Sequence, residues 1–468
     1  MRRAEARYFV GNLESMTKII KITSAAIIII IIVALGSAPR KAYAEAMKLE
    51  LRDAIDVALQ KNESYRIANK EMEKADGRIS EAVAGALPQV TGGLTYLKNW
   101  RIPTGVFQMD GETIAFKFGT EDRYIADLTV TQPIYVGGRT FTALKIARTY
   151  KKMTRELTKS ARQELKVAVF NSFFGAILAD EIHRVNRESY ELARQNLDVV
   201  EKMFNQGMAA EFDYLRARVT VANLEPDVIK SGNDRDLAMK ALKNVLGVDL
   251  DTDIDLEVDF DSTQFVIPPL QSDEAVAELK GNRPEIIVSG YETGMRRQLV
   301  SLAKADYKPS LIFSSSLQYQ SQFNEGNVFD KKWDRSLSSA LILSVPIFDS
   351  WKTPGKVKQA NVEMVQSRLK EESVVKYMIL DYEQSLGKYG EARKRLSVQG
   401  GAVELARRGL EIANVRYENG VGTQIEVSDA RLSLARAEIN RAVAFHDLAT
   451  GYASLLRALG REVEPAKQ

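Results

Sequence analysis

Residues 203–219 read MFNQGMAAEFDYLRARV and residues 416–432 read RYENGVGTQIEVSDARL, which places Gly207 and Gly420 213 positions apart. Apolar residues recur every three or four positions along residues 190–204 and 403–417, which lead to the two glycines, and again after each glycine. This spacing is typical of a helical coiled coil, and glycine readily takes the positive φ that ends a helix. The two stretches therefore predict two antiparallel helical hairpins, each turning at its glycine.

A second pair of matching stretches lies upstream at the same offset. Residues 130–139, VTQPIYVGGR, match residues 343–352, LSVPIFDSWK, and align Pro133 with Pro346 at the predicted strand ends. Several landmarks that keep one offset indicate a duplicated unit. We expect each copy to follow the order helix, strand, loop, strand, long helix, turn and helix.

The segments before these prolines alternate between apolar and polar residues. Residues 124–132 read YIADLTVTQ, and residues 90–96, 311–319 and 337–345 behave similarly, the last more weakly. Such segments of about ten residues are typical of transmembrane barrel strands, although a soluble sheet is an open alternative. Four strands cannot close a barrel, because closed barrels begin at about eight strands. A membrane interpretation therefore requires several chains, and three chains of four strands would supply twelve.

Long helices are predicted between the strands and the glycine turns. Residues 139–205 contain no proline, and residues 355–419 contain none either. Each stretch of roughly 65 residues would form a rod of about 100 Å, which no globular core can bury. Pro226 interrupts the otherwise helical residues 211–246 and should kink or stop that helix.

The composition excludes several classes of function. The chain has no cysteine, and its two histidines, His183 and His446, fall in helical patterns, so we expect no catalytic centre, metal site or cofactor. No phosphate-binding loop is present. Without residues 1–44, which carry seven basic and two acidic residues, the net charge falls from +3 to −2. Nothing therefore indicates nucleic-acid binding.

Residues 1–44 have the pattern of a secretory signal peptide, with lysines before an apolar run and Ala42-Tyr43-Ala44 at the cleavage position. The run of about eleven strongly apolar residues is short for a spanning helix, which needs about 20, and an uncleaved anchor is the alternative. Translation starts at Met1 or Met16. We then expect a first repeat at 45–265, a second repeat at 266–460 and a tail at 461–468.

Together, the strand ends QPIYVGG and VPIFDSW and the two glycine turns resemble the TolC-type outer-membrane efflux family, over about residues 49–460. The resemblance implies an α+β membrane protein: a homotrimer with one 12-stranded transmembrane barrel continuous with a coiled-coil periplasmic tunnel. It implies a passive exit duct in the outer membrane of a Gram-negative bacterium. The implied partners are a periplasmic adaptor (membrane fusion) protein and an inner-membrane pump of the RND or ABC type, in tripartite efflux or type I secretion.

The resemblance also implies functional residues at the helix tips. Glu426 and Asp429 lie three apart, share a helix face and match the family's acidic pair at the periplasmic aperture. Three-fold symmetry would form two carboxylate rings, which favour cations and bind divalent ions. The alternative is a simple preference of acidic residues for a helix N-terminus. In the first copy, Asp213 and Arg216 would form a latch to a neighbouring helix.

The turns at Gly207 and Gly420 are the expected docking surface for the adaptor. The sequence departs from the family at Ser350-Trp351, where Gly-Gly is usual, and it lacks the lipid-bearing cysteine that many relatives carry. The alternative for the whole chain is a soluble periplasmic coiled-coil scaffold with a small sheet. An enzyme is not expected, because no nucleophile motif appears and the histidines are far apart in sequence.

Overall fold

The computed structural model describes residues 47–109, 112–257, 262–268, 271–324, 332–419 and 421–464. The predicted signal peptide at 1–44 and Gly420 lie outside the described residues. A short two-stranded sheet pairs β1 (Met47–Leu49) with β6 (Ile254–Leu256). All of the long helices and the larger sheet belong to one compact unit, formed by Leu49–Leu250 and Leu256–Gln468.

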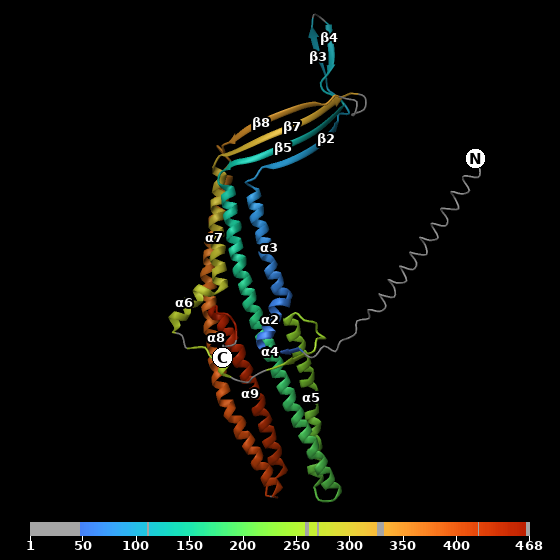
Figure 1. Ribbon diagram of the computed structural model, residues 1–468, viewed down its shortest axis with the longest axis vertical. Helices are drawn as coiled ribbons and strands as arrows, with labels where there is room; N and C mark the ends of the chain where they lie inside the picture. Colours follow the sequence, from blue (N-terminus) through green and yellow to red (C-terminus); the bar gives the residue numbers. More distant parts are fainter. Residues whose placement is uncertain are drawn as a thin grey trace, which may run out of the picture. The chain divides into compact units, whose positions relative to one another are not determined.

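The elements of this unit follow one another in two similar series (Figure 1). The first series is α2 (Leu51–Lys61), α3 (Glu63–Ala84), β2 (Gln89–Lys98), β3 (Thr104–Met109), β4 (Glu112–Lys117), β5 (Asp122–Val136), α4 (Arg139–Asn205) and α5 (Glu211–Leu246). The second series is α6 (Ser272–Asn282), α7 (Pro284–Lys304), β7 (Ser310–Phe323), β8 (Asp334–Ser344), α8 (Lys352–Glu418) and α9 (Gln424–Leu459). The 3-10 turns η1 (Ser262–Phe265) and η2 (Ala305–Tyr307) precede α6 and follow α7.

The two series repeat at the level of single residues. Helices α4 and α8 both contain 67 residues, and α5 and α9 both contain 36. Each bound of these four helices moves by 213 positions: Arg139 to Lys352, Asn205 to Glu418, Glu211 to Gln424 and Leu246 to Leu459. The predicted duplicated unit of strands and long helices is therefore confirmed.

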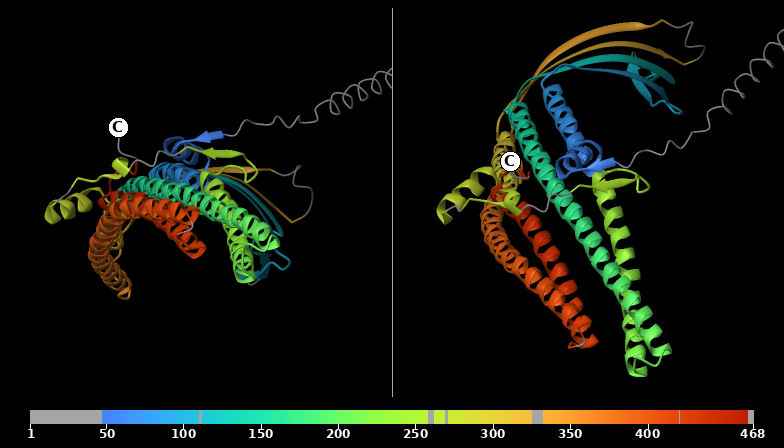
Figure 2. Two further views of the ribbon diagram at one scale, coloured as in Figure 1. Left: turned by 90° about the horizontal axis from the view of Figure 1, so that it is seen from below. Right: turned by 60° about the horizontal axis from the view of Figure 1, so that its bottom comes forward.

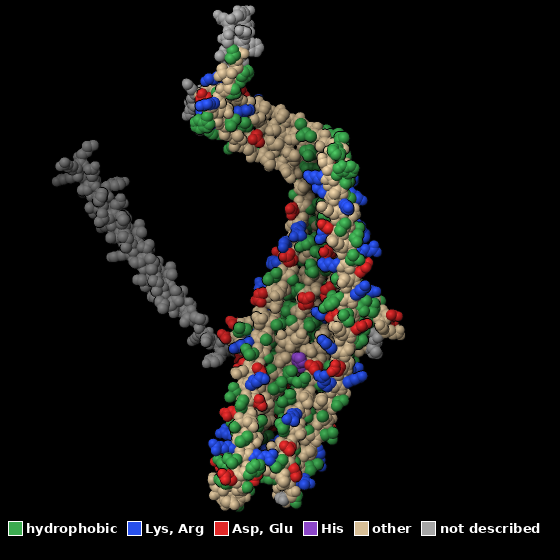
Figure 3. All heavy atoms as spheres, turned by 180° about the vertical axis from the view of Figure 1, so that it is seen from behind, with side chains coloured by type: hydrophobic (Ala, Val, Ile, Leu, Met, Phe, Trp, Pro, Cys, Tyr) green, Lys and Arg blue, Asp and Glu red, His purple; other side chains and the backbone are tan. Residues whose placement is uncertain are grey.

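The larger sheet is antiparallel, in the order β2-β5-β7-β8. Because residues directly opposite each other lie on the same face, the register assigns the two faces. One row across the sheet reads Gly92, Leu128, Leu317, Leu337, and the adjacent row, on the other face, reads Thr91, Thr129, Ser316, Ser338. One face is thus apolar and the other is polar, as the alternation predicted, and few charged side chains cover the middle of the sheet (Figure 3).

The two prolines of the repeat occupy different positions. Pro133 lies within β5, where the pairing with β7 shifts register between Pro133 and Tyr135, because proline has no N–H to donate to the ladder. Pro346 lies beyond the last residue of β8, Ser344. The predicted strand ends are therefore close to the observed ones, with β5 continuing for three further residues to Val136.

Strands β5 and β8 are each connected to the following long helix by a turn that contains two residues with positive φ. Gly137 and Gly138 have φ of 67° and 85°, and their counterparts Ser350 and Trp351 have φ of 55° and 64°. A side chain in this left-handed conformation costs roughly 1 kcal/mol per residue. A Cβ on Gly137 would also lie 2.6 Å from the carbonyl oxygen of Ala305, so the first copy requires glycine there.

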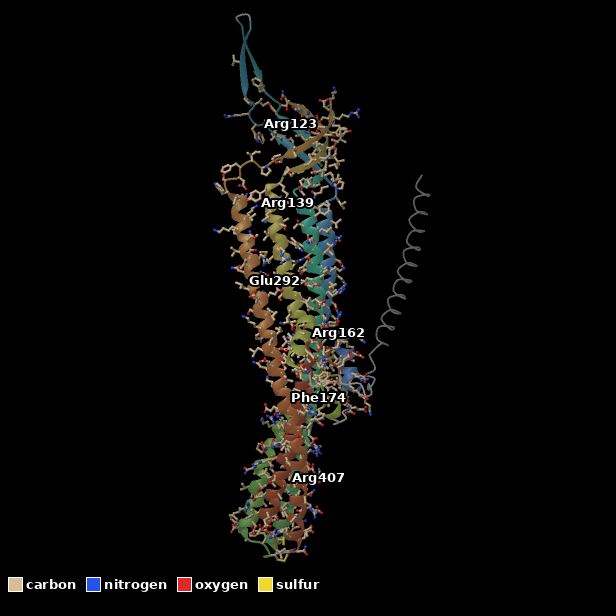
Figure 4. The ribbon with its side chains drawn as sticks, turned by 90° about the vertical axis from the view of Figure 1, so that its left-hand side faces the viewer. Arg123, Arg139, Arg162, Phe174, Glu292 and Arg407 are labelled. Atoms are coloured by element: carbon tan, nitrogen blue, oxygen red, sulfur yellow. The ribbon has the colours of Figure 1, made fainter. Side chains whose placement is uncertain are left out.

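The long helices form a curved layer within this unit (Figure 2). About midway along them lies an aromatic core, in which Phe174 (Figure 4) makes edge-on contacts with Phe265 and Phe445 at 5.5 and 5.9 Å. Tyr389 on α8 donates a hydrogen bond to the carbonyl oxygen of Phe265 at 2.8 Å. The connection between the two copies is therefore held against α4, α8 and α9.

Helix α5 does not stop at Pro226, contrary to one of the outcomes predicted for it. The helix runs without a break from Glu211 to Leu246, with Pro226 exposed inside it. None of the helices among the described residues is both long enough and apolar enough to cross a membrane.

Candidate functional site

The first helix tip is built by a glycine turn between α4 and α5. Gly207 has φ of 74°, its N–H donates to the carbonyl oxygen of Phe204 at 2.9 Å, and the N–H of Met208 donates to Met203 at 2.8 Å. This pairing closes the helix end in the manner of a Schellman motif. The rings of Phe204 and Tyr214 stack at 5.2 Å across the hairpin, so the turn and the first contact of the hairpin stabilise each other.

The second tip repeats this hydrogen-bonding pattern around Gly420, which itself lies outside the described residues. The N–H of Val421 donates to the carbonyl oxygen of Arg416 at 3.0 Å, the counterpart of the bond from Met208 to Met203. Thr423 caps α9 by accepting a hydrogen bond from the N–H of Glu426 at 3.3 Å. The two tips therefore share a backbone design and differ in their side chains.

Glu426 and Asp429 lie exposed near the start of α9, three residues apart. The guanidinium Nε of Arg416, at the end of α8, lies 3.4 Å from Oε2 of Glu426. Asp429 forms no ion pair with any residue that the structure describes. Among the described residues, the carboxylate of Glu426 is thus partly neutralised across the hairpin, whereas that of Asp429 is not.

The sequence analysis missed Arg416, although a basic residue in the last helical turn is a known stabiliser of helix C-termini. The predicted latch residues lie on α5, where Asp213 is exposed and Arg216 is half-buried. Neither forms an ion pair with another described residue of the same chain.

The two halves are instead joined by contacts that sequence reasoning did not find. Near the tips, the amide of Gln424 on α9 donates to Oδ1 of Asn196 on α4 at 2.6 Å. Higher along the helices, Glu438 on α9 lies 3.7 Å from Arg184 on α4 and 3.6 Å from Arg407 on α8, the last labelled in Figure 4. These side chains connect the second hairpin to the first rod at two levels.

Two rods ending in capped hairpins beneath a sheet with one apolar face are an arrangement shared with known proteins. The family model described as outer membrane efflux protein matches residues 54–248 and 275–461, one segment in each copy. The chain belongs to this family. It is accordingly an outer-membrane efflux or secretion channel protein and not an enzyme, which decides against the soluble scaffold.

Relatives within the family are distant in sequence. The chain is 22% identical to the alkaline protease secretion protein AprF of Pseudomonas aeruginosa, over 88% of this chain and 84% of that protein. It is 20% identical to the outer membrane protein TolC of Escherichia coli, over 86% and 82%. The fold matches the crystal structure of a membrane protein from Pseudomonas aeruginosa with a TM-score of 0.71 at 20% identity, covering 89% and 91% of the two chains. The Campylobacter jejuni CmeC outer membrane channel gives 0.71 at 17% identity, covering 89% and 87%.

Proposed function

We propose that three copies of this chain form one exit duct, with a shared twelve-stranded barrel in the outer membrane of a Gram-negative bacterium and a tunnel of helices in the periplasm. The observation that carries this proposal is the sheet. Its outer strands β2 and β8 each pair on one side, whereas every backbone group inside a bilayer needs a partner. Pairing β8 of one copy with β2 of the next removes every open edge and leaves the apolar face toward lipid.

A groove on α8 supports the same assembly. It is open and largely apolar, and it is lined in part by Tyr307, Pro354, Val357, Val362 and Val365. The side chains of Val362 and Val365 are about half exposed in the single chain, at 50% and 52%. Because α8 follows β8 and α3 precedes β2, pairing of these strand edges brings α3 of the next copy beside this groove.

The names of the relatives indicate the kind of assembly in which this chain would work. These relatives include a toluene efflux pump outer membrane protein and the protease secretion protein AprF. This chain would serve a tripartite assembly of the same kind, with a periplasmic adaptor and an inner-membrane pump of the RND or ABC type. The pump supplies the energy, so the duct itself needs no cofactor.

The tips at Gly207 and Gly420 would dock the adaptor. Met208 and Val421, beside the two glycines, are 62% and 70% exposed, so tryptophan at either position alters the surface and keeps the glycine turn. Met208→Trp and Val421→Trp should abolish export from cells while trimers still assemble in the outer membrane. Undiminished export by both variants would contradict docking at the tips.

The aperture would be lined by Glu426 and Asp429, repeated three times around the axis. Replacing both residues by alanine should lower cation selectivity and weaken block by divalent ions in single-channel recordings. Arg416→Ala should act in the opposite direction, because it removes the charge that faces Glu426. Asp273→Ala serves as the control, because it removes one negative charge at the exposed start of α6, away from the tips. Unchanged selectivity in the double variant would rule out the ring.

Asp213 and Arg216 would act as a latch toward a helix of the neighbouring copy, since neither forms an ion pair with a described residue of its own chain. Alanine at either position should raise the conductance of the resting channel. Resting conductance equal to that of the unmodified trimer would remove them from the closing mechanism.

A further inference from the structure

The turn from β8 into α8 differs from its repeat in side chains and not in backbone. Both turns hold two consecutive residues with positive φ, but the second carries Ser350 and Trp351 where the first carries Gly137 and Gly138. These are the only non-glycine residues with positive φ in the part of the chain that the structure describes. Side chains retained in a strained conformation are a recurrent feature of functional sites.

Three large apolar side chains at this turn are exposed in the single chain. Ile347, Phe348 and Trp351 are 89%, 74% and 75% exposed in the chain. At the first turn, a Cβ on Gly138 would meet no atom within 4 Å, so this position is open space in the first copy and holds an indole in the second. The turn therefore displays hydrophobic surface that its own fold does not cover.

This surface is continuous with the apolar face of the sheet. Leu341 and Leu343 on β8 are each 63% exposed, and Val345 beyond the strand is 51% exposed. Hydrophobic side chains also gather at the end of the sheet that joins the helices (Figure 3). The turn consequently extends the face assigned to lipid by the proposed barrel.

A basic side chain follows directly after the aromatic ones. Lys352, the first residue of α8, is exposed and forms no ion pair with a described residue. Tryptophan favours the boundary between hydrocarbon and headgroups, because its ring is apolar and its N–H seeks a polar partner. Lysine at the same level complements lipid phosphate. An indole, a phenyl ring and the ammonium group of Lys352, all within five residues, match the chemistry of a phospholipid interface.

We infer that the Ser350–Trp351 turn is a lipid-binding anchor that inserts Phe348 and Trp351 at the periplasmic headgroup boundary and sets the depth of the barrel. This inference rests on the proposed function, since it takes the sheet to lie in a bilayer. The anchor occurs once per chain and so three times around the assembled trimer.

Tryptophan fluorescence in the reconstituted full-length trimer tests the anchor. Trp100→Phe with Trp333→Phe leaves Trp351 as the single tryptophan, because the chain contains three. The protein is placed in phosphatidylcholine vesicles whose chains are brominated either near the carbonyl end or near the terminal methyl. The emission of Trp351 should be quenched several-fold more strongly by bromine near the carbonyl end, and little by aqueous iodide.

Two further single-tryptophan variants, both also carrying Trp351→Phe, separate this inference from the proposed function. Leu341→Trp reports on the apolar face of the sheet, and Tyr377→Trp, at a site 64% exposed on α8, reports on the helical region away from the membrane. Quenching by brominated lipid at positions 351 and 341 and not at 377 supports the anchor. Lipid quenching at 341 without quenching at 351 overturns the anchor and keeps the barrel. If iodide also fails to quench Trp351 in that case, a neighbouring copy covers the indole. Absence of lipid quenching at 341 overturns the barrel and the anchor with it.

Discussion

At the scale of single residues, the glycines that end α5 and α9 each lie against the backbone that connects two other helices, α2 to α3 and α6 to α7. Gly247 and Gly460 end α5 and α9 with φ of 69° and 74°. A Cβ on Gly247 would lie 2.7 Å from the carbonyl group of Lys61, and a Cβ on Gly460 would lie 2.7 Å from the carbonyl carbon of Asn282. The same close approach of two backbones therefore occurs in both copies, and it leaves no room for a side chain at either glycine.

This packing predicts unequal effects for two chemically identical substitutions. Gly460→Ala and Gly207→Ala both place alanine at φ of 74°, which costs roughly 1 kcal/mol. Position 207 is otherwise open, whereas alanine at 460 must push two backbones apart, at a further cost of about 1–3 kcal/mol. Thermal unfolding followed by circular dichroism should show the larger loss for Gly460→Ala. Equal losses would mean that the contact with Asn282 can relax freely.

An ion pair near the end of the chain predicts a pH dependence. Arg461 donates to both carboxylate oxygens of Glu278 on α6, at 2.6 and 2.8 Å, and these hydrogen bonds hold the pKa of Glu278 below its usual value. A lowered pKa means that the pair stabilises the fold above a pH of about 5, and that this contribution is lost as the pH falls through the ordinary and then the lowered pKa.

Arg461→Gln should therefore reduce the free energy of unfolding by about 1 kcal/mol at neutral pH, and this effect should disappear in acid, below the lowered pKa of Glu278. Arg368→Gln is the matched control, since Arg368 lies 3.7 Å from Glu372 with 77% of its side chain exposed, and it should change little at either pH. Denaturant unfolding at both pH values measures the difference. A loss that persists in acid would show that Arg461 acts through packing and not through its charge.

At the scale of elements, the two copies keep equal helix lengths despite a proline in one of them. Pro226 lies inside α5, and the repeat places Ile439 of α9 at the same position. Proline inside a helix removes one hydrogen bond and crowds the carbonyl group four residues earlier. Packing of α5 along α4 therefore outweighs the local preference to end the helix.

Pro226→Ala should stabilise α5 by about 1–3 kcal/mol, because the missing N–H is restored at an exposed site. Ile439→Pro should destabilise α9 by a similar amount or more. Hydrogen exchange of the amides in each helix, read by mass spectrometry, separates these local effects. Slower exchange in α5 is the expected result, and unchanged or faster exchange would show that the proline is part of the preferred geometry.

At the scale of the whole molecule, the chain leaves unfilled contacts at both sides of the sheet and along α8. One copy exposes the edges of β2 and β8 and the groove at Val362 and Val365. Burial of a valine side chain stabilises an interface by about 1.5 kcal/mol. Replacing the valine by a charged residue would remove this contribution at each of the three proposed interfaces.

Val365→Asp should shift the purified protein from trimer toward monomer, with helix content kept. Gln271→Asp, at the exposed N-cap of α6, adds the same charge away from the groove and should leave the trimer intact. Light scattering in detergent gives the mass of each variant. A stable trimer of Val365→Asp would place the interface elsewhere.

The sequence located the candidate residues of the tips but not the contacts that these tips make. The glycine spacing predicted both hairpins, and the family resemblance singled out Glu426 and Asp429, which lie at the start of α9 and whose role at an aperture stays a prediction. The ion pair of Glu426 with Arg416 and the bond from Gln424 to Asn196 were not predicted. The second of these joins residues 228 positions apart, and no local pattern reports on such a distance.

The sequence by itself determined the duplication, because the two copies match residue by residue at one offset. It also determined the alternation of the strands and the length of the rods, because these are periodic properties of neighbouring residues. Tertiary structure alone decided the sheet order β2-β5-β7-β8, the bulge at Pro133 and the unbroken course of α5. It also decided that Ser350 and Trp351 adopt the conformation of the two glycines in the other copy. These features depend on contacts between distant segments, whose packing energy exceeds the local preferences of the residues that it overrides.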